Sequence, residues 1–215
     1  MTKSRLDQEL VNRGLVTTRS QAESYIKLGY VSVNKKLITK PGTSVGETDD
    51  IKLNLDEQYV SRAALKLASV AKILSVSFRG ATVLDVGSST GGFTDYALKQ
   101  GARKVIAVEL GTNQMHPSLR NDPRIVLHEK TDIRDFMDVD LSIDVVVIDV
   151  SFVSLQDILP SVARLSNKNT KVLAMVKPQF EAKYSNVKHK GVIKNDRIRR
   201  DILKDFEIWV QKLFV

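Results

Sequence analysis

The chain of 215 residues has no cysteine, and its three histidines are widely spaced along the sequence. A disulfide framework is therefore excluded, and a metal site is not expected, because thiolate and imidazole are the usual ligands of structural zinc. No apolar run approaches the length of a membrane span, and the first residues lack the apolar core of a signal peptide. We therefore expect a soluble, cytoplasmic protein that binds no metal.

Acidic residues are also in short supply, because 25 of them face 33 lysines and arginines and leave a net charge of +8. The imbalance is strongest before residue 46, where basic residues far outnumber acidic ones. A basic surface attracts polyanions such as nucleic acids, although charged runs are more often ordinary solvated faces. The composition therefore favours a polyanionic partner and leaves the solvated face as the alternative.

The length allows a large domain and a small module, and the first part of the chain has the pattern of an α+β module. Capping-box patterns at Ser4 and at Thr18 each precede apolar residues at helical spacing, which predicts two short helices. Gly29 suits the left-handed end of the second helix, and alternating apolar residues beyond it predict strands. We expect a small domain over residues 1–55 and a linker over residues 56–60.

From Ser61 onwards, strand and helix patterns alternate along the chain. A helix rich in alanine and leucine, capped by Ser61, carries Lys66 in its first turns. The alternation that follows predicts right-handed crossovers, and therefore a doubly wound, Rossmann-like α/β domain over residues 61–215. The expected strands are 82–86, 104–108, 125–127, 143–149 and 171–176, and the expected helices are 91–100, 112–120, 155–165 and 195–213.

A glycine-rich turn follows the first of these strands, in the sequence Asp85-Val-Gly-Ser-Ser-Thr-Gly-Gly-Phe-Thr. Glycine lets the backbone approach a ligand closely at the carboxyl end of a parallel strand. The spacing Gly-x-x-x-Gly-Gly differs from that of dinucleotide-binding folds, and no Gly-Lys-Ser/Thr follows to hold a triphosphate. A ligand with few or no phosphates fits the turn, and S-adenosylmethionine is such a cofactor. The alternative is a tight turn without a ligand. The candidate cofactor-binding residues here are Asp85, Gly87, Ser88, Gly91, Gly92 and Phe93.

Two further acids are candidates for the same cofactor. Glu109 ends the second strand, where a carboxylate accepts hydrogen bonds from ribose hydroxyls, and Asp132 follows the third strand, where a polar residue contacts adenine. A solvated acid at a strand end and an ordinary loop acid are the respective alternatives. Phe93, in turn, is better explained by packing in the core than by stacking on adenine.

Asp149 and Lys177 follow the last two predicted strands. Asp149 closes the apolar run Val145-Val-Val-Ile, and an acid at the end of a buried strand is usually paired or functional. Lys177 precedes a proline, which disfavours helix and aims the side chain at the strand ends. Because active sites of open α/β sheets gather at that edge, we expect both side chains in one site.

The first module resembles the S4-like RNA-binding domain, on the strength of Arg5-Leu-Asp-x-x-Leu, Thr18-Arg-Ser-Gln-Ala, Gly29-Tyr-Val-Ser-Val-Asn and Lys40-Pro-Gly. The resemblance implies that the basic residues of this module contact RNA phosphates, which supply affinity without sequence information. The candidate RNA-binding residues are Arg5, Arg13, Arg19, Lys27, Lys35, Lys36 and Lys40.

The rest of the chain resembles the FtsJ-like 2′-O-methyltransferases. Together with Tyr59-Val-Ser-Arg-x-x-x-Lys-Leu, Asp149-Val-Ser-Phe and Val176-Lys-Pro-Gln-Phe-Glu, the whole chain resembles the TlyA family of ribosomal RNA methyltransferases, historically labelled hemolysins. The resemblance implies methyl transfer from S-adenosylmethionine to a ribose 2′-hydroxyl of ribosomal RNA, in known members a cytidine. It also implies that Lys66, Asp149 and Lys177 belong to a catalytic Lys-Asp-Lys-Glu set.

The fourth member of that set has no match in this chain. In the family the glutamate lies in a further strand after the last helix, whereas Glu207 falls inside the predicted helix and is not assigned the role. We therefore expect a sheet that lacks its last C-terminal strands relative to the family.

Three other functions stay open at this point. The chain could be an RNA-binding protein whose methyltransferase domain is inactive, a membrane-lytic protein as the old label suggests, or a methyltransferase acting on a small molecule. The lack of a long apolar run speaks against the membrane-lytic function, and the basic first module speaks against the small-molecule substrate.

Overall fold

The computed structural model describes residues 3–16, 18–27, 29–54, 59–137, 142–184 and 191–213. The chain forms two compact units, Met1–Gln58 and Tyr59–Val215, which we call the N-terminal and C-terminal units and describe separately. This division falls inside the expected linker 56–60, of which residues 56–58 lie outside the described part of the chain. The boundaries expected at 55 and 61 stay a prediction.

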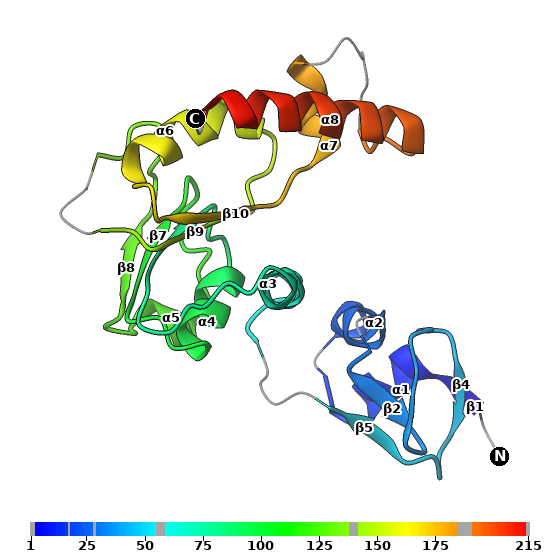
Figure 1. The fold of residues 1–215 in the computed structure, drawn as a ribbon. Helices are drawn as coiled ribbons and strands as arrows, with labels where there is room; N and C mark the ends of the chain where they lie inside the picture. Colours follow the sequence, from blue (N-terminus) through cyan, green and yellow to red (C-terminus); the bar gives the residue numbers. More distant parts are fainter. Residues whose placement is uncertain are drawn as a thin grey trace. The chain divides into compact units, whose positions relative to one another are not determined.

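The N-terminal unit combines two helices with short antiparallel strands (Figure 1). Strand β1 pairs with β4, and β2 pairs with both β3 and β5. Leu6, Leu10, Tyr25, Ile26 and Val31 are fully or almost fully buried and form the centre of the unit. The elements are β1 (Lys3–Arg5), α1 (Leu6–Asn12), α2 (Arg19–Lys27), β2 (Val31–Val33), β3 (Lys36–Leu37), β4 (Ser44–Gly46) and β5 (Ile51–Leu53).

One of the two predicted helix starts is wrong. Ser4 lies in β1, opposite Val45 of β4, and its hydroxyl donates to Glu9, so α1 begins at Leu6 without a side-chain cap. The Thr18 cap is confirmed, because its hydroxyl accepts from the Gln21 amide at 3.2 Å. The Ser4 motif failed because pairing with β4, a strand far along the chain, takes precedence over a local cap.

The C-terminal unit is a parallel five-stranded sheet in the order β10-β9-β6-β7-β8, which confirms the doubly wound α/β fold. The chain first runs outward from β6 to β8 and then returns to the other side of β6. The point of reversal therefore lies between β6 and β9, where ligands bind in such folds. The elements are α3 (Ala63–Ile73), β6 (Thr82–Val86), α4 (Gly92–Lys99), β7 (Lys104–Val108), α5 (Pro117–Arg120), β8 (Ile125–His128), β9 (Val145–Ile148), α6 (Leu155–Leu165), β10 (Lys171–Ala174), α7 (Pro178–Glu181), a 3-10 turn (Ala182–Tyr184) and α8 (Asp196–Leu213).

Helices cover both faces of this sheet (Figure 1). Helices α3 and α4 pack on one face through Ala64, Leu67 and Ala97, against strand residues such as Val83 and Val105. Helices α6 and α8 pack on the other face, where Leu159, Val162 and Phe206 meet Leu84, Ile106 and Val146. Alternate residues of each strand serve opposite faces, so both faces must be apolar, which explains the continuous hydrophobic runs.

The predicted element boundaries are largely right, with four corrections. The strands expected at 143–149 and 171–176 are shorter, and the helix expected at 112–120 is only the single turn α5, which begins at Pro117. Helix α7 was not predicted. Within the described residues no strand follows β10, and Glu207 lies on the exposed side of α8.

Candidate active site

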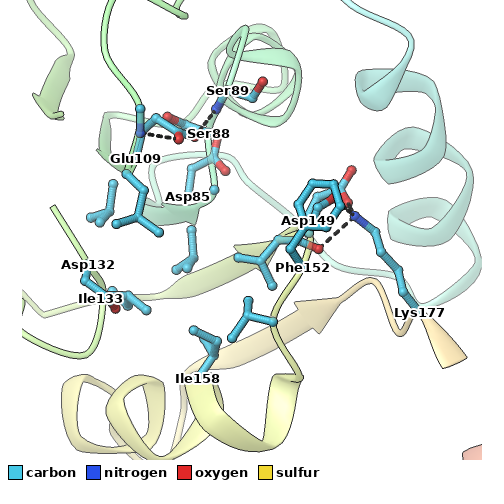
Figure 2. Close-up of a pocket in the computed structure, with 18 of the residues that line it drawn as sticks. Asp85, Ser88, Ser89, Glu109, Asp132, Ile133, Asp149, Phe152, Ile158 and Lys177 are labelled. Carbon is cyan, nitrogen blue, oxygen red and sulfur yellow. Dashed lines mark hydrogen bonds and ion pairs between the residues drawn. The ribbon is translucent and has the colours of Figure 1, made fainter. Parts of the chain in front are cut away.

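A cavity of about 1220 Å³ opens at the carboxyl edge of the sheet. Its polar lining comes from α3 and from the segments that follow all five strands, and thus from both sides of the point where the strand order reverses. Figure 2 shows Asp85, Ser88, Ser89 and Glu109 around one part of it, and Asp149, Phe152 and Lys177 around another. The predicted cofactor-binding and catalytic residues all line this cavity except Gly91.

The glycines of the turn after β6 are required by close packing. Gly91 has a φ of +86°, and a Cβ there would lie 2.6 Å from Leu119 Cδ1. A Cβ on Gly92 would lie 2.2 Å from Ser61 Oγ and 3.0 Å from Ala63 Cβ, because the start of α3 rests on this turn. The sequence pattern attributes these glycines to a ligand, whereas part of the requirement comes from neighbouring protein atoms.

Asp85 has an unsatisfied oxygen at the end of β6. Its side chain is only 1% exposed, and Oδ2 accepts a hydrogen bond of 2.6 Å from the Thr94 hydroxyl. Oδ1 is buried without a hydrogen-bond partner among the described residues, and so is the hydroxyl of Ser88. Burial raises the pKa of Asp85 to about 7, against the lowering effect of hydrogen bonds from Thr94. Unsatisfied buried polar atoms are rare, and at the edge of a cavity they suit a ligand that supplies the hydrogen bonds.

Glu109 and Asp132 are held in place by local bonds. Glu109 accepts from the Ser89 amide at 2.9 Å and from the Gly111 amide at 2.7 Å, so its carboxylate connects the turn after β6 to the segment after β7. Asp132 forms a bidentate pair with Arg134, whose hydrogen bonds hold the pKa of the carboxyl below its usual range. Both acids line the cavity, and their cofactor roles stay predictions.

Phe93 is 5% exposed and belongs to the core between α4 and the sheet, although part of it lines the cavity. Packing is therefore its main structural role, which was the alternative left open by the sequence.

Lys177 and Asp149 form an ion pair of 2.7 Å between Nζ and Oδ1 (Figure 2). The same ammonium donates to the Val150 carbonyl at 2.7 Å and to the Ser151 hydroxyl at 2.8 Å. The extended backbone of Lys177, with φ of −115° and ψ of 99°, agrees with the expected effect of the proline that follows. One cation is thus fixed at the end of β10 by three oxygen atoms of the segment after β9.

Lys66 reaches the same cavity from α3. Its ammonium lies 3.7 Å from Met175 Sδ, two residues before Lys177. The three side chains predicted to be catalytic therefore line one cavity, although they come from α3 and from the ends of β9 and β10.

Two residues of this region were not predicted from the sequence. Phe152 has a φ of +67°, is 92% exposed, and lies 5.6 Å from the Phe180 ring, centre to centre. Glu181 is 2% exposed and bonds to the start of α6. Phe152 ends the motif Asp149-Val-Ser-Phe, and Glu181 ends the motif Val176-Lys-Pro-Gln-Phe-Glu. The exposure of a phenylalanine and the burial of a glutamate depend on tertiary structure, so the order of residues in these motifs does not reveal them.

In the N-terminal unit, four of the predicted RNA-binding residues have acidic partners: Arg5, Arg13, Arg19 and Lys27. Arg5 and Arg19 both bond to Asp7, which is fully buried. Hydrogen bonds from Arg5, and to a lesser extent from Arg19, lower the pKa of the Asp7 carboxyl to about 2. Arg13 bonds to Glu9 and to backbone carbonyls of the segment 46–49. Arg5 and Arg19 remain about half exposed, whereas Arg13 is mostly covered.

The four lysine candidates, Lys27, Lys35, Lys36 and Lys40, are exposed, and the Lys27 ammonium lies 3.7 Å from the Glu23 carboxylate. Lys35 and Lys36 lie in the β2–β3 hairpin, where Asn34 and Lys35 both have positive φ. The exposed ammonium groups of Lys35, Lys36 and Lys40 are available to a partner, and RNA binding by all seven residues stays a prediction.

The described residues contain no group of three histidine, cysteine, aspartate or glutamate side chains arranged to hold a metal ion. None of the described helices is both long enough and apolar enough to cross a bilayer.

Comparison with known proteins matches both units to families. Residues 59–215 match the FtsJ-like methyltransferase family, and residues 4–51 match the S4 domain. The chain is 40% identical over 208 residues to YqxC of Bacillus subtilis, named as a candidate rRNA methyltransferase, covering 94% of this chain and 73% of that protein. It is 37% identical over 201 residues to the 16S/23S rRNA (cytidine-2′-O)-methyltransferase TlyA of Mycobacterium tuberculosis, covering 92% and 75%.

A solved structure of a candidate hemolysin from Streptococcus thermophilus is similar to 99% of this chain, with a TM-score of 0.69 and 35% identity, and the match covers 79% of that chain. Similar sequences therefore occur under both kinds of name.

Proposed function

The chain belongs to the FtsJ-like methyltransferase family, and we propose that it transfers the methyl group of S-adenosylmethionine to a ribose 2′-hydroxyl of ribosomal RNA, with cytidine as the target nucleoside. The observation that carries the proposal is the Asp149–Lys177 ion pair, which lines the same cavity as the unsatisfied oxygen of Asp85. Such a cavity can take a charged cofactor at one end and a polar nucleophile at the other.

The residues at the Asp85 end fit the cofactor. Asp85 Oδ1 and the Ser88 hydroxyl need partners, and the amino group of the methionine part supplies hydrogen-bond donors. Glu109 would accept from the ribose hydroxyls, and the segment at Asp132 would lie against the adenine. When bound, S-adenosylmethionine supplies an electrophilic methyl group on a positively charged sulfur.

The residues at the Lys177 end suit a weak oxygen nucleophile. A ribose hydroxyl gains negative charge as it attacks, and an ammonium fixed in advance stabilises that charge without having to reorganise. Lys177 is fixed by three oxygen atoms, and Lys66 adds a further positive charge to the cavity. Asp149 holds the Lys177 ammonium in position, and the Lys177–Asp149 pair would take up the proton that the hydroxyl loses.

Binding of the RNA itself is assigned to the N-terminal unit. Exposed lysines such as Lys27, Lys36 and Lys40 would contact phosphates, and this contribution weakens as salt rises because counterions are released on binding. A substrate in ribosomes would also place the protein in the cytoplasm.

The test uses the purified chain, radiolabelled S-adenosylmethionine and isolated ribosomal subunits. We expect label in the RNA at a nucleotide whose 3′ phosphodiester resists alkali, because a methylated 2′-oxygen cannot attack that bond. Lys177→Ala should lose transfer and keep cofactor binding. Transfer that survives in Lys177→Ala would refute the role of Lys177. RNA binding with no transfer by the unaltered chain would instead identify an RNA-binding protein with an inactive methyltransferase domain.

A further inference from the structure

Glu181 is a buried acid outside the catalytic set. Its Oε1 accepts from the Leu155 amide at 2.8 Å, and its Oε2 accepts from the hydroxyl of Ser154, the capping residue of α6. Burial raises the pKa of the Glu181 carboxyl, while hydrogen bonds from Ser154, Leu155 and Gln156 act against this increase. The positive end of the α6 dipole also favours an acid at this place. A group that is costly to bury but fully bonded usually fixes a particular geometry.

The geometry that Glu181 fixes involves Lys177. The two residues bracket the single turn α7, with Lys177 preceding it and Glu181 ending it. Lys177 bonds to residues 149–151, at the start of the segment between β9 and α6, and Glu181 bonds to residues 154–155, at its end. One helical turn therefore holds both ends of the segment that carries Asp149.

The pairing of β10 with β9 brings the backbone before Lys177 alongside Ile148, and two apolar contacts border α7: Phe180 lies against the exposed Phe152, and Ala182 faces α8. Ala182, which follows Glu181, packs with Ile193 and Ile202 of the region around α8. That contact fixes the end of α7 relative to α8. It does not bring Lys177 to the end of β9.

Two exposed bonds also reach α6 from the 3-10 turn that follows α7. The Lys183 ammonium lies 3.3 Å from the Asp157 carboxylate, and the Tyr184 hydroxyl donates to the same carboxylate. Exposed pairs of this kind contribute little, because water competes for both partners. The bonds of Glu181 are buried, so they are the stronger connection between α7 and the start of α6.

We infer that Glu181 is a positioning residue for the reaction proposed above, because it keeps α7 against the start of α6 and so keeps Lys177 at Asp149. The inference rests on the proposed function for its kinetic consequence. Its structural consequence, the placement of the Lys177 ammonium, can be measured without any methyl transfer.

The experiment compares Glu181→Ala and Glu181→Gln with the unaltered chain. In E181Q the new side-chain amide can still accept from the Leu155 amide and donate to Ser154, so this variant should keep the connection that E181A loses. E207Q, on the exposed side of α8, controls for the loss of a carboxylate. All proteins are measured well below their unfolding temperatures, which circular dichroism determines first.

The first measurement is the single-turnover rate of methyl transfer with saturating cofactor and ribosomal subunits. In E181A the rate should fall by about 100-fold, the effect of a displacement near 1 Å in an active site. The dissociation constant of S-adenosylmethionine should stay the same, because Asp85 and Glu109 are untouched. E181Q should retain most of the rate, and E207Q all of it.

The second measurement is the acetylation rate of Lys177 by N-hydroxysuccinimidyl acetate, followed by mass spectrometry and normalised to Lys72, an exposed lysine of α3. Lys177 should react faster in E181A than in the unaltered chain and in E181Q. An unchanged acetylation rate in E181A would overturn the inference, and so would faster acetylation with undiminished transfer. Absence of transfer in the unaltered chain would refute the proposed function alone, and acetylation would then decide on Glu181.

Discussion

Replacing Asp85 by asparagine should make the cofactor-free protein more stable at alkaline pH. The carboxyl is buried, with a pKa raised from 3.8 to about 7, and burial is the main cause. Below pH 3.8 both the folded and the unfolded chain carry the proton, so this group contributes no pH dependence. Between the two values the unfolded carboxyl is ionised while the folded one is still protonated. The folded state then binds more protons, and the free energy of unfolding falls as pH rises.

The size of the fall follows from the difference between the two pKa values. A difference of roughly 3 pH units, at roughly 1.4 kcal/mol each, amounts to about 4 kcal/mol. Roughly two thirds of this lies between pH 5 and pH 8, so the advantage of Asp85→Asn should grow by about 2–3 kcal/mol over that interval. The asparagine oxygen can still accept from the Thr94 hydroxyl, so the variant keeps the local bond.

The assay is urea unfolding of the cofactor-free chain at pH 5 and pH 8, followed by the fluorescence of Trp209. This residue is the chain's single tryptophan and packs between α8 and the sheet, so it reports on the C-terminal unit. Asp205→Asn, an exposed change on α8, controls for the loss of an ordinary carboxylate. If the two stability curves of Asp85→Asn and the unaltered chain run parallel between pH 5 and pH 8, the carboxyl does not titrate as argued.

The remaining predictions concern the glycine turn and the N-terminal unit. Gly92→Ala should lower the free energy of unfolding by about 1–3 kcal/mol in the same urea assay, because the added Cβ meets Ser61 and Ala63; undiminished stability would mean that the start of α3 yields freely. Arg13→Ala should speed amide hydrogen exchange across residues 3–54, since its bonds to Glu9 and to backbone carbonyls each stabilise the unit by about 1–3 kcal/mol. Lys36→Ala should leave exchange unchanged and reduce the salt dependence of RNA binding, measured by filter binding, by about one counterion. Faster exchange in Lys36→Ala, with only the salt dependence changed in Arg13→Ala, would contradict the structure.

Most of the sheet could be predicted because its strands are buried on both faces. Strands β6 and β7 and helix α6 begin and end at the expected residues, since long apolar runs bounded by glycine or polar residues leave little ambiguity. The short strands β3 and β4 could not be predicted, because Lys36-Leu37 and Ser44-Val45-Gly46 each contain a single apolar side chain and so show no alternation. Helix α7 was missed for a related reason, since a single turn after a proline has no periodicity of its own.

The candidate site could be predicted where function depends on position along a strand. Asp85, Asp149 and Lys177 lie at or just after the ends of buried strands, and parallel strands bring their ends to one edge. The sequence could not predict which atoms each polar side chain takes as its hydrogen-bond partners. The unsatisfied oxygen of Asp85, the carbonyls around Arg13 and the bonds of Glu181 all depend on contacts across many residues.

Because all five strands of the C-terminal unit point the same way, the opposite edge of the sheet is free of the chemistry described above. Asn169 lies there, in an exposed turn between α6 and β10. The sequence has no thiol to compete, so Asn169→Cys would offer one attachment point for a fluorophore or a surface tether. Single-molecule observation of the working protein could use such a label with the cavity facing away from the support.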